Sequence, residues 1–216
     1  MLRALARFFA RHDEGDKGPM KVIVGLGNPG KDYERTRHNV GWWILDHLAD
    51  VWHFDGWRRD GEARVTSGHV GDASVRLVKP QTYVNLSGAV LRPYLRRAGW
   101  SPQHDLLVVL DEVALSLGAF RFRARGSSAG HNGLKSIEGA LGHQDYARLR
   151  VGIGPPAGRN RGDLADYVLS DFGKSDAAVV KELMPTFVEG IESWIKEGIE
   201  PVMNRFNRKV RTEESP

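Results

Sequence analysis

Short apolar runs rich in β-forming residues alternate along this chain with segments of helical periodicity, and this alternation most constrains the fold. Residues 21–26 form such a run and end in a Gly-Asn-Pro-Gly turn, while residues 106–110 are typical of a buried central strand. Residues 40–52 and 133–141 carry apolar side chains at helical spacing. The pattern predicts an α/β fold, because strands that alternate with helices form a sheet covered by helices.

The other expected elements follow from turn signals and periodicity. We expect a hairpin of residues 63–70 and 74–78, helices over 85–97, 163–169 and 175–196, strands at 120–123 and 149–153, and a loop at 126–130. With 216 residues, of which 41% are hydrophobic, the chain can form one domain with a full core.

The two ends of the chain differ from its middle. Residues 1–19 join a short basic amphipathic segment to a polar linker, and we expect them to be a flexible extension before a folded domain over residues 20–206. An organellar transit peptide is the alternative, although acidic residues follow the basic segment at once. Residues 207–216 form a polar tail that we expect to fray.

Composition excludes several classes of protein. The chain has no cysteine, so disulfides, thiolate nucleophiles and cysteine-ligated zinc are ruled out. Its eight histidines show no zinc-binding spacing, and we expect no metal. No apolar run is long enough to span a membrane. We therefore expect a cytoplasmic protein without a membrane partner.

Basic residues gather between residues 119 and 161. They are Arg121, Arg123, Arg125, Lys135, Arg148, Arg150, Arg159 and Arg161, against Glu138 and Asp145 as the acids of this stretch. Clustered arginines attract phosphates whatever the base sequence. The stretch predicts a phosphate-binding face and nucleic acid as a partner. The alternative is that these arginines pair with acids on a solvated surface.

One motif suggests a different protein. Residues 25–30 have the G-x-G-x-x-G spacing of a dinucleotide-binding turn. In that turn a helix begins at the second glycine. Here Pro29 disfavours helical geometry at Asn28, and the next helix signal is a capping residue at Asn39. We therefore reject an NAD or FAD enzyme and expect no cofactor.

Polar side chains stand where apolar runs break. They are Asn28, His38, Asn85, Asp111 and Asn132. Such breaks tend to meet at one edge of an α/β sheet, where ligands bind. Neutral imidazole can take a proton from water, a carboxylate can orient the ring, and amides can hold water and a developing oxyanion. The set therefore predicts a hydrolytic site.

Each of these residues also has a structural interpretation. Asn28 suits a turn, and Asn39, Asn85 and Asn132 suit helix caps. His38 could serve the structure alone, and Asp111 could be a cap or an ion-pair partner. The sequence positions taken one at a time do not decide between the two interpretations.

Taken together, the motifs resemble those of bacterial peptidyl-tRNA hydrolase. The matching segments are residues 24–30, Tyr33, Thr36-Arg37-His38-Asn39, residues 79–88, Asp111-Glu112 and residues 130–137, in the order and spacing of that family. The similarity runs from about residue 21 to about residue 206. It implies a single α/β domain with a mixed central sheet flanked by helices. It also implies a monomer, without an obligate protein partner, that cleaves the ester joining a peptide to the terminal ribose of tRNA and so recycles tRNA from stalled translation.

The resemblance implies a role for each matching position. His38 would activate water, Asp111 would orient His38, Asn28 and Asn132 would bind the peptide backbone and the reacting region, and Asn85 would hold the oxyanion and water. Tyr33 would lie near the terminal nucleotide, Tyr83 would bind substrate, and Arg123 and Arg150 would clamp the 5′ phosphate of tRNA. Arg123 stands where the family often has Lys, and a guanidinium retains that role.

The chain departs from the family pattern in three places. Ala114 stands where a second Asp is frequent, residues 116–118 replace a proline-rich turn, and Tyr83-Val84 replaces an aromatic–Met pair. These changes bear on the tRNA approach and on the site for the peptide. An RNA-binding relative that has lost catalysis is the alternative, but the intact His38 and Asp111 argue against it.

Overall fold

The computed structural model describes residues 20–154 and 164–207. The predicted N-terminal extension, the tail beyond residue 207, and Arg159 and Arg161 of the basic stretch lie outside these ranges. Of the predicted 163–169 helix, only residue 163 is left out.

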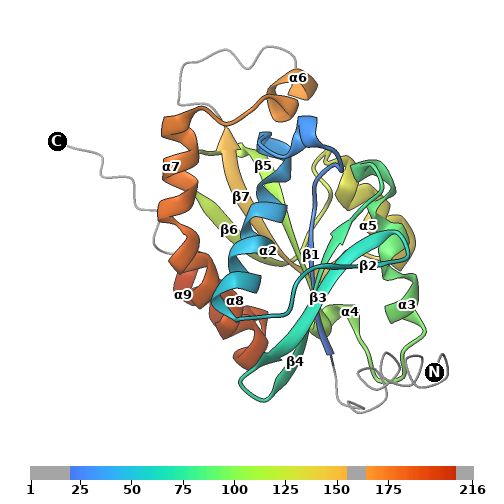
Figure 1. The fold of residues 1–216 in the computed structure, drawn as a ribbon. Coiled ribbons are helices and arrows are strands. Elements are labelled where there is room, and N and C mark those ends of the chain that lie inside the picture. Colours follow the sequence, from blue (N-terminus) through green and yellow to red (C-terminus); the bar gives the residue numbers. More distant parts are fainter. Residues whose placement is uncertain (1–19, 155–163, 208–216) are drawn as a thin grey trace, which may run out of the picture.

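A mixed sheet forms the centre of the fold (Figure 1). Its strands in the described ranges are β1 (Met20–Gly25), β2 (Arg58–Asp60), β3 (Ala63–Val70), β4 (Ala73–Pro80), β5 (Leu106–Ser116), β6 (Phe120–Arg125) and β7 (Asp145–Gly154). They lie in the order β2-β3-β4-β1-β5-β7-β6. The four neighbours β4, β1, β5 and β7 are parallel, whereas β2, β3 and β6 pair antiparallel. The carboxyl ends of the four parallel strands therefore meet at one edge.

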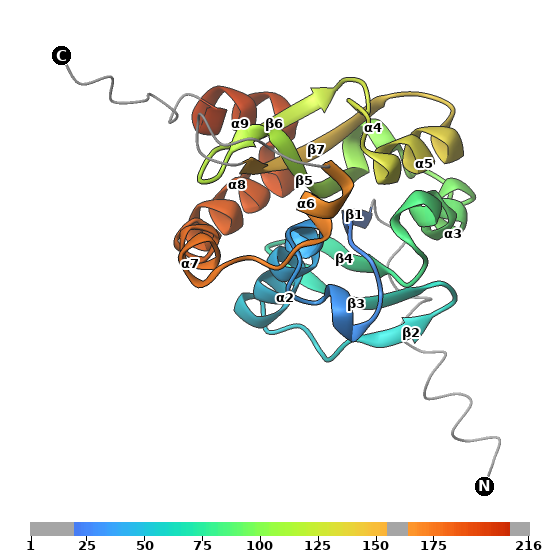
Figure 2. The same cartoon turned by 90° about the horizontal axis from the view of Figure 1, so that it is seen from above.

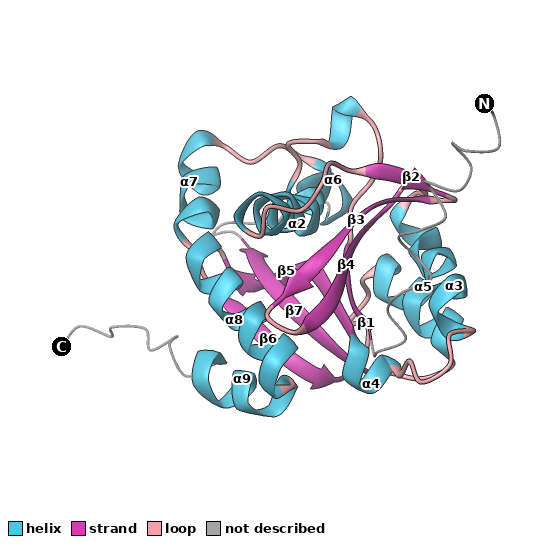
Figure 3. Cartoon of the chain, turned by 60° about the horizontal axis from the view of Figure 1, so that its bottom comes forward, coloured by secondary structure: helices cyan, strands magenta, loops and turns pink. Residues whose placement is uncertain are grey.

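Helices cover both faces of the sheet (Figure 3). One face carries α2 (Val40–Val51), α7 (Lys174–Glu182), α8 (Met184–Glu197) and α9 (Ile199–Phe206); the other carries the 3₁₀ helix η4 (Val84–Leu91), α3 (Arg92–Leu95) and α5 (Asn132–Leu141). Short elements complete the path: η2 (Lys31–Tyr33), η3 (Arg37–Asn39), α4 (Pro102–Asp105) and α6 (Leu164–Leu169). The predicted fold class, a mixed sheet flanked by helices, is confirmed. None of the helices described is long and apolar enough to cross a membrane.

Two helices predicted from periodicity differ from those in the structure. The predicted helix over residues 85–97 is a 3₁₀ helix as far as Leu91, followed by the short α3. The predicted helix over residues 175–196 is divided at Leu183 into α7 and α8. Pro185 stands in the first turn of α8, where its missing N–H leaves no bond unmade, whereas inside a continuous helix it would break one.

Other elements are longer than predicted or were not predicted. Strand β5 continues through Asp111 to Ser116, so this aspartate lies within a strand and not at its end. The register of β5 against β7 shifts between Glu112 and Ser116. The edge strand β2 and the helices α4 and α9 were not expected. Strand β2 and helix α4 are too short for a period to show, whereas α9 carries a clear amphipathic period that could have been recognised.

Two glycines, Gly25 at the end of β1 and Gly41 in the first turn of α2, allow α2 to pack closely on the sheet. A Cβ at Gly41 would lie 2.6 Å from the Val109 carbonyl oxygen and 2.7 Å from that of Leu26, and one at Gly25 would lie 2.6 Å from the Gly41 carbonyl oxygen. After Gly25 the chain runs through η2 and η3 before α2 begins at Val40. Gly25 therefore serves helix packing, and the dinucleotide-binding interpretation is rejected.

We expect Gly41→Ala to lower the free energy of unfolding by about 1–3 kcal/mol, the usual cost of overpacking, because the atoms it would meet are backbone. The matched control is Gly139→Ala on α5, where a Cβ meets nothing within 4 Å. There the loss of glycine's freedom should stabilise the protein by about 0.5–1 kcal/mol. Urea unfolding of both variants checks the pair, and equal effects would refute the close-packing argument.

Candidate active site

A cavity of about 520 Å³ lies where the predicted polar residues converge, at the carboxyl edge of the parallel strands. It is lined by Asn28, His38, Val84, Asp111, Glu112, Val113, residues 128–132, Leu164, Ala165, Val168 and Leu169. Seen from above, α6 lies over this edge, with the start of α2 and the α5 side around it (Figure 2). Four of the predicted site residues, Asn28, His38, Asp111 and Asn132, therefore share one cavity.

Asp111 holds the imidazole of His38. The Nδ1 of His38, on η3, lies 2.8 Å from Oδ1 of Asp111, on β5. Both side chains are buried, with 9% and 2% of their surface exposed. Because an ionised carboxylate can only accept, Nδ1 carries the hydrogen and Nε2 is the unprotonated nitrogen. This Nε2 has no partner among the described residues.

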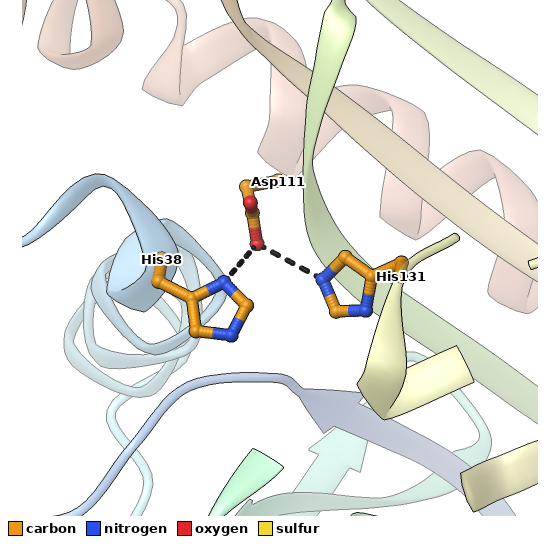
Figure 4. A group of neighbouring side chains, drawn as sticks. All are labelled: His38, Asp111 and His131. Carbon is orange, nitrogen blue, oxygen red and sulfur yellow. Dashed lines mark hydrogen bonds and ion pairs between the residues drawn. The ribbon is translucent and has the colours of Figure 1, made fainter. Parts of the chain in front are cut away.

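A second histidine, His131, contacts the same carboxylate oxygen (Figure 4). Its Nε2 lies 3.1 Å from Oδ1 of Asp111, while its Nδ1 accepts from the backbone N–H groups of Gly133 and Leu134 at 3.1 and 3.4 Å. The backbone donors thus fix the tautomer that donates through Nε2. His131 was not among the predicted site residues, although it adjoins Asn132 inside a recognised motif.

The electrostatics of the pair follow from burial and charge. Burial lowers the pKa of His38, but the charge of Asp111 and the hydrogen bond to it outweigh burial, so the pKa lies above its usual value of 6.5. Burial raises the pKa of Asp111, yet the charges of His38 and His131 and their hydrogen bonds hold it well below its usual range. Asp111 is therefore ionised at neutral pH.

Asn39 does not cap α2 through its side chain. Its amide pairs instead with the backbone of Asn28, accepting from the N–H and donating to the carbonyl oxygen, both at 2.9 Å. The side-chain oxygen of Asn28 in turn accepts from the Val84 N–H at 2.9 Å. The turn that carries Asn28 is thereby fixed, and the Nδ2 of Asn28 has no partner among the described residues.

The other two asparagines are not side-chain caps either. His131 caps α5, and Asn132 is the first residue of that helix. Asn132 is exposed and lines the cavity. Asn85 lies in η4, whose start shows no side-chain cap, and it is exposed without lining the cavity. Asn39 occupies the predicted N-cap position of α2 without a side-chain cap hydrogen bond, whereas the capping interpretation of Asn85 and Asn132 is wrong.

The predicted substrate-binding tyrosines do not line the cavity. Tyr33 is half-buried at the end of η2, and Tyr83 is 61% exposed just before η4. Val84, which follows Tyr83, is the residue of this segment that reaches the cavity. The structure thus brings Val84 to the cavity and leaves Tyr83 on the surface.

The two arginines predicted to clamp phosphate differ in their surroundings. Arg150 forms an ion pair with Glu112 and donates to the Ser127 carbonyl oxygen at 2.6 Å. Arg123 on β6 is exposed and has no partner among the described residues. Because Arg121 is the register partner of Arg150, Arg123 and Arg150 lie on the same face of the sheet.

Arg148 is not available to a phosphate. It is fully buried, donates to the carbonyl oxygens of Gly126 and Gln144, and lies 4.1 Å from the ring centre of Tyr146. Burial lowers its pKa. The basic stretch therefore contains an arginine that orders the loop before His131 as well as exposed ones.

His38, Asp111 and His131 could also be arranged around a metal ion, since their ligand atoms lie within 4.8 Å of one another. In the structure one ring nitrogen of each histidine, Nδ1 of His38 and Nε2 of His131, donates to Asp111. A metal held by these two nitrogens and the carboxylate would replace both hydrogen bonds and would occupy the atoms that orient His38. The geometry fits a carboxylate that orients two imidazoles, with one free nitrogen facing the cavity.

Comparisons with known proteins agree with one another. The peptidyl-tRNA hydrolase family matches residues 22–214. A peptidyl-tRNA hydrolase of Gemmatimonas aurantiaca is 56% identical over 190 residues, which cover 88% of this chain and 100% of the relative. That of Bacillus subtilis is 42% identical over 191 residues, or 88% and 100%. The crystal structure of peptidyl-tRNA hydrolase from Acinetobacter baumannii matches with a TM-score of 0.78 and 29% identity, over 87% of this chain and 94% of that one.

The fold and the cavity define an α/β protein with a histidine–aspartate centre suited to hydrolysis. With these matches, over nearly the full length of the relatives, the chain belongs to the peptidyl-tRNA hydrolase family.

Proposed function

We propose that this protein, a hydrolase of peptidyl-tRNA, cleaves the ester between the peptide and the 3′-terminal ribose of tRNA with water activated by His38. The observation that carries this mechanism is the contact of His38 Nδ1 with Asp111, which leaves Nε2 without a partner among the described residues in a histidine that lines the cavity. Oriented imidazole is the general base that ester hydrolysis by water requires.

The reaction then needs two proton movements. Nε2 of His38 takes a proton from water as the oxygen attacks the ester carbonyl, and the charge of Asp111 stabilises the imidazolium. The same proton passes to the ribose oxygen when the carbon–oxygen bond breaks. The products are tRNA with a free 3′-terminal hydroxyl and a peptide carboxylic acid, which loses the second proton of the water to solvent and becomes a carboxylate. No metal or cofactor enters these steps.

Amide side chains supply the remaining polar contacts in this proposal. The unpartnered Nδ2 of Asn28 and the exposed amide of Asn132 border the cavity and can hold the peptide backbone and the carbonyl oxygen. Asn85 and Tyr83 are exposed on η4 and before it, where they would meet substrate that extends beyond the cavity. Tyr33 would contact the terminal nucleotide.

The protein's nucleic-acid partner is the tRNA of its substrate. We assign phosphate binding to Arg123 and Arg150, with Arg123 as the residue that is free to bind in the structure. Arg150 can bind phosphate only by sharing or leaving its contact with Glu112. We also propose a cytoplasmic monomer with one catalytic domain over residues 20–206, without an obligate protein partner.

The test is release of the amino acid from N-blocked aminoacyl-tRNA by the purified protein. We expect release in buffer that contains chelator, once Mg²⁺ has been restored to fold the tRNA. Absence of release would refute the function. Loss of activity that only zinc or manganese restores would refute the metal-free mechanism.

We expect the double variant Arg123→Ala with Arg150→Ala to raise the KM for full-length N-blocked aminoacyl-tRNA and to flatten its salt dependence, because each phosphate contact adds to the salt slope. Hydrolysis of a short substrate without the 5′ phosphate should change little. Arg123→Ala alone should also raise the KM. The Arg123 side chain has no partner among the described residues, so it is free to bind a phosphate of tRNA. If the double variant keeps the wild-type KM and salt dependence, these two arginines do not bind the tRNA phosphate and tRNA is bound at another surface.

A further inference from the structure

Arg37, the residue before His38, is a partly buried cation that binds the segment between α6 and α7 and the start of α7. Its Nη1 donates to Oγ of Ser170 at 2.8 Å and to the Asp171 carbonyl oxygen at 2.6 Å, and its Nη2 forms an ion pair with Asp176 at 3.0 Å. Only 12% of the Arg37 side chain is exposed. A guanidinium can make several such bonds at once because its donors form a rigid fork.

The backbone joins the same two segments. The Arg37 N–H donates to the Ser170 carbonyl oxygen at 3.1 Å, and the Phe172 N–H donates to the Arg35 carbonyl oxygen at 3.0 Å. Thr36 and Asp171 form an antiparallel bridge between these bonds. The chain just before the catalytic histidine is thus attached to the chain just after α6.

Arg37 also packs against α6 itself. Its guanidinium carbon lies 4.7 Å from the ring centre of Tyr167, on α6, and 5.3 Å from that of Phe172. Tyr167 in turn donates through its hydroxyl to the Ile153 carbonyl oxygen, on β7, at 2.6 Å. One side chain therefore connects η3, α6 and, through Tyr167, the sheet.

This connection is placed at the catalytic cavity. Helix α6 provides one of its walls through Leu164, Ala165, Val168 and Leu169, and Figure 2 shows α6 above the start of α2. His38 enters the cavity from η3. A substrate held against α6 therefore has its distance to the general base set by the contacts of the neighbouring arginine.

We propose that Arg37 is a positioning residue, which holds His38 and the α6 wall of the cavity in a fixed relation so that the base stays aimed at a substrate bound against α6. The inference rests on the proposed role of His38. Small errors of placement are costly in catalysis, since a shift of about 1 Å can lower a rate by roughly 10²-fold.

The chain provides a matched control two residues away. Arg35 binds the same segment through Asp171 at 2.9 Å, but 81% of its side chain is exposed. Exposed ion pairs contribute little because water screens them. Arg35→Ala removes the same side-chain type and a contact to the same segment without touching α6 or the cavity.

We expect Arg37→Ala to lower kcat on N-blocked aminoacyl-tRNA by up to roughly 10²-fold, while Arg35→Ala changes it less than about twofold. Arg37→Lys should recover part of the loss, because an ammonium can reach Asp176 but cannot make all the bonds of the fork. Circular dichroism at the assay temperature establishes which variants are folded. If Arg37→Ala does not fold, Asp176→Asn and Arg37→Lys take its place in the comparison.

A second measurement separates positioning from a purely structural contribution. The described groups that hydrogen-bond to or stack beside the His38 ring are Asp111 from β5 and His131, the N-cap of α5. If Arg37→Ala loosens the His38–Asp111 contact, the pKa of His38, followed by NMR, should return toward its ordinary value. Arg35→Ala should leave this pKa at the wild-type position.

Two results would overturn the proposal. One is a folded Arg37 variant with wild-type kcat and wild-type His38 titration, and the other is an equal loss in the Arg35 variant. Failure of the proposed function is distinguishable, because it would appear as an inactive wild-type protein or as a His38→Ala variant with unchanged turnover.

Discussion

Replacement of His38 by alanine is expected to lower turnover on N-blocked aminoacyl-tRNA by roughly 10²–10⁴-fold, the usual contribution of a positioned general base. The one hydrogen bond of the His38 side chain among the described residues is to Asp111, its ring lies beside that of His131, and it lines the cavity, so its loss should leave tRNA binding intact. Single-turnover kinetics measures the expected loss in the rate of hydrolysis, and the tRNA affinity of the same preparation shows whether binding is retained.

The matched control is His47→Ala, a histidine farther along on α2 that does not line the cavity. It should retain wild-type turnover. If turnover in the His38 variant stays near wild type, water is activated by another group and the mechanism fails. A loss of tRNA affinity equal to the loss of turnover would instead make His38 a binding residue.

The pH dependence of the wild-type enzyme follows from the same contact. The base must be neutral, and the pKa of His38 lies above its usual value because Asp111 stabilises the imidazolium against the effect of burial. kcat/KM should therefore rise with pH, with the midpoint of its acidic limb above about 6.5, and reach a plateau. The His38→Ala variant should lack this limb.

The alternation of apolar runs and helical segments was sufficient to predict the fold class, because burial in a sheet and on a helix produces different periods in the sequence. The divided helix at Leu183 could also have been predicted from Pro185. Strand β5 beyond residue 110 could not, because Asp111 interrupts the apolar run and only the pairing with β7 continues the strand. Helix η4 packs closely on α5, where a Cβ on Gly88 would lie 2.1 Å from the Ser136 carbonyl oxygen, and periodicity does not distinguish its 3₁₀ form from an α-helix.

Local motifs indicated some residues of the candidate site, but the contacts between them depend on the tertiary fold. The recognised motifs included His38 and Asp111, whose contact joins residues far apart in the sequence. The motif with His131 was recognised as well, but its role depends on which nitrogen faces Asp111, and the backbone at the start of α5 determines this. The partner of Arg150, Glu112, lies across a strand pair that no local pattern specifies. The chemical roles given to all of the site residues, Asn85, Tyr33 and Tyr83 among them, stay predictions.

Asp111→Asn is expected to lower turnover by less than the loss of His38 does, and to shift the acidic limb of the pH profile downward. In the structure one oxygen of Asp111 accepts from both His38 and His131. Because backbone donors fix His131 as a donor toward this position, the amide that replaces the carboxylate should place its oxygen there and should keep the tautomer of His38. Geometry is then retained and the negative charge is lost.

The size of the effect follows from that charge. A hydrogen bond to a charged group contributes about 1.5–3 kcal/mol, which corresponds to a fall in turnover of roughly 10- to 10²-fold. Without the charge, burial, which is the largest influence on the pKa of His38, is opposed only by a hydrogen bond to a neutral amide, so this pKa should fall and the acidic limb should move to lower pH. Asp111→Ala should cost more, because it removes orientation as well. If Asp111→Asn keeps the wild-type limb, or loses as much turnover as His38→Ala, then Asp111 does more than orient and stabilise the imidazole, and the proposed division of roles is wrong.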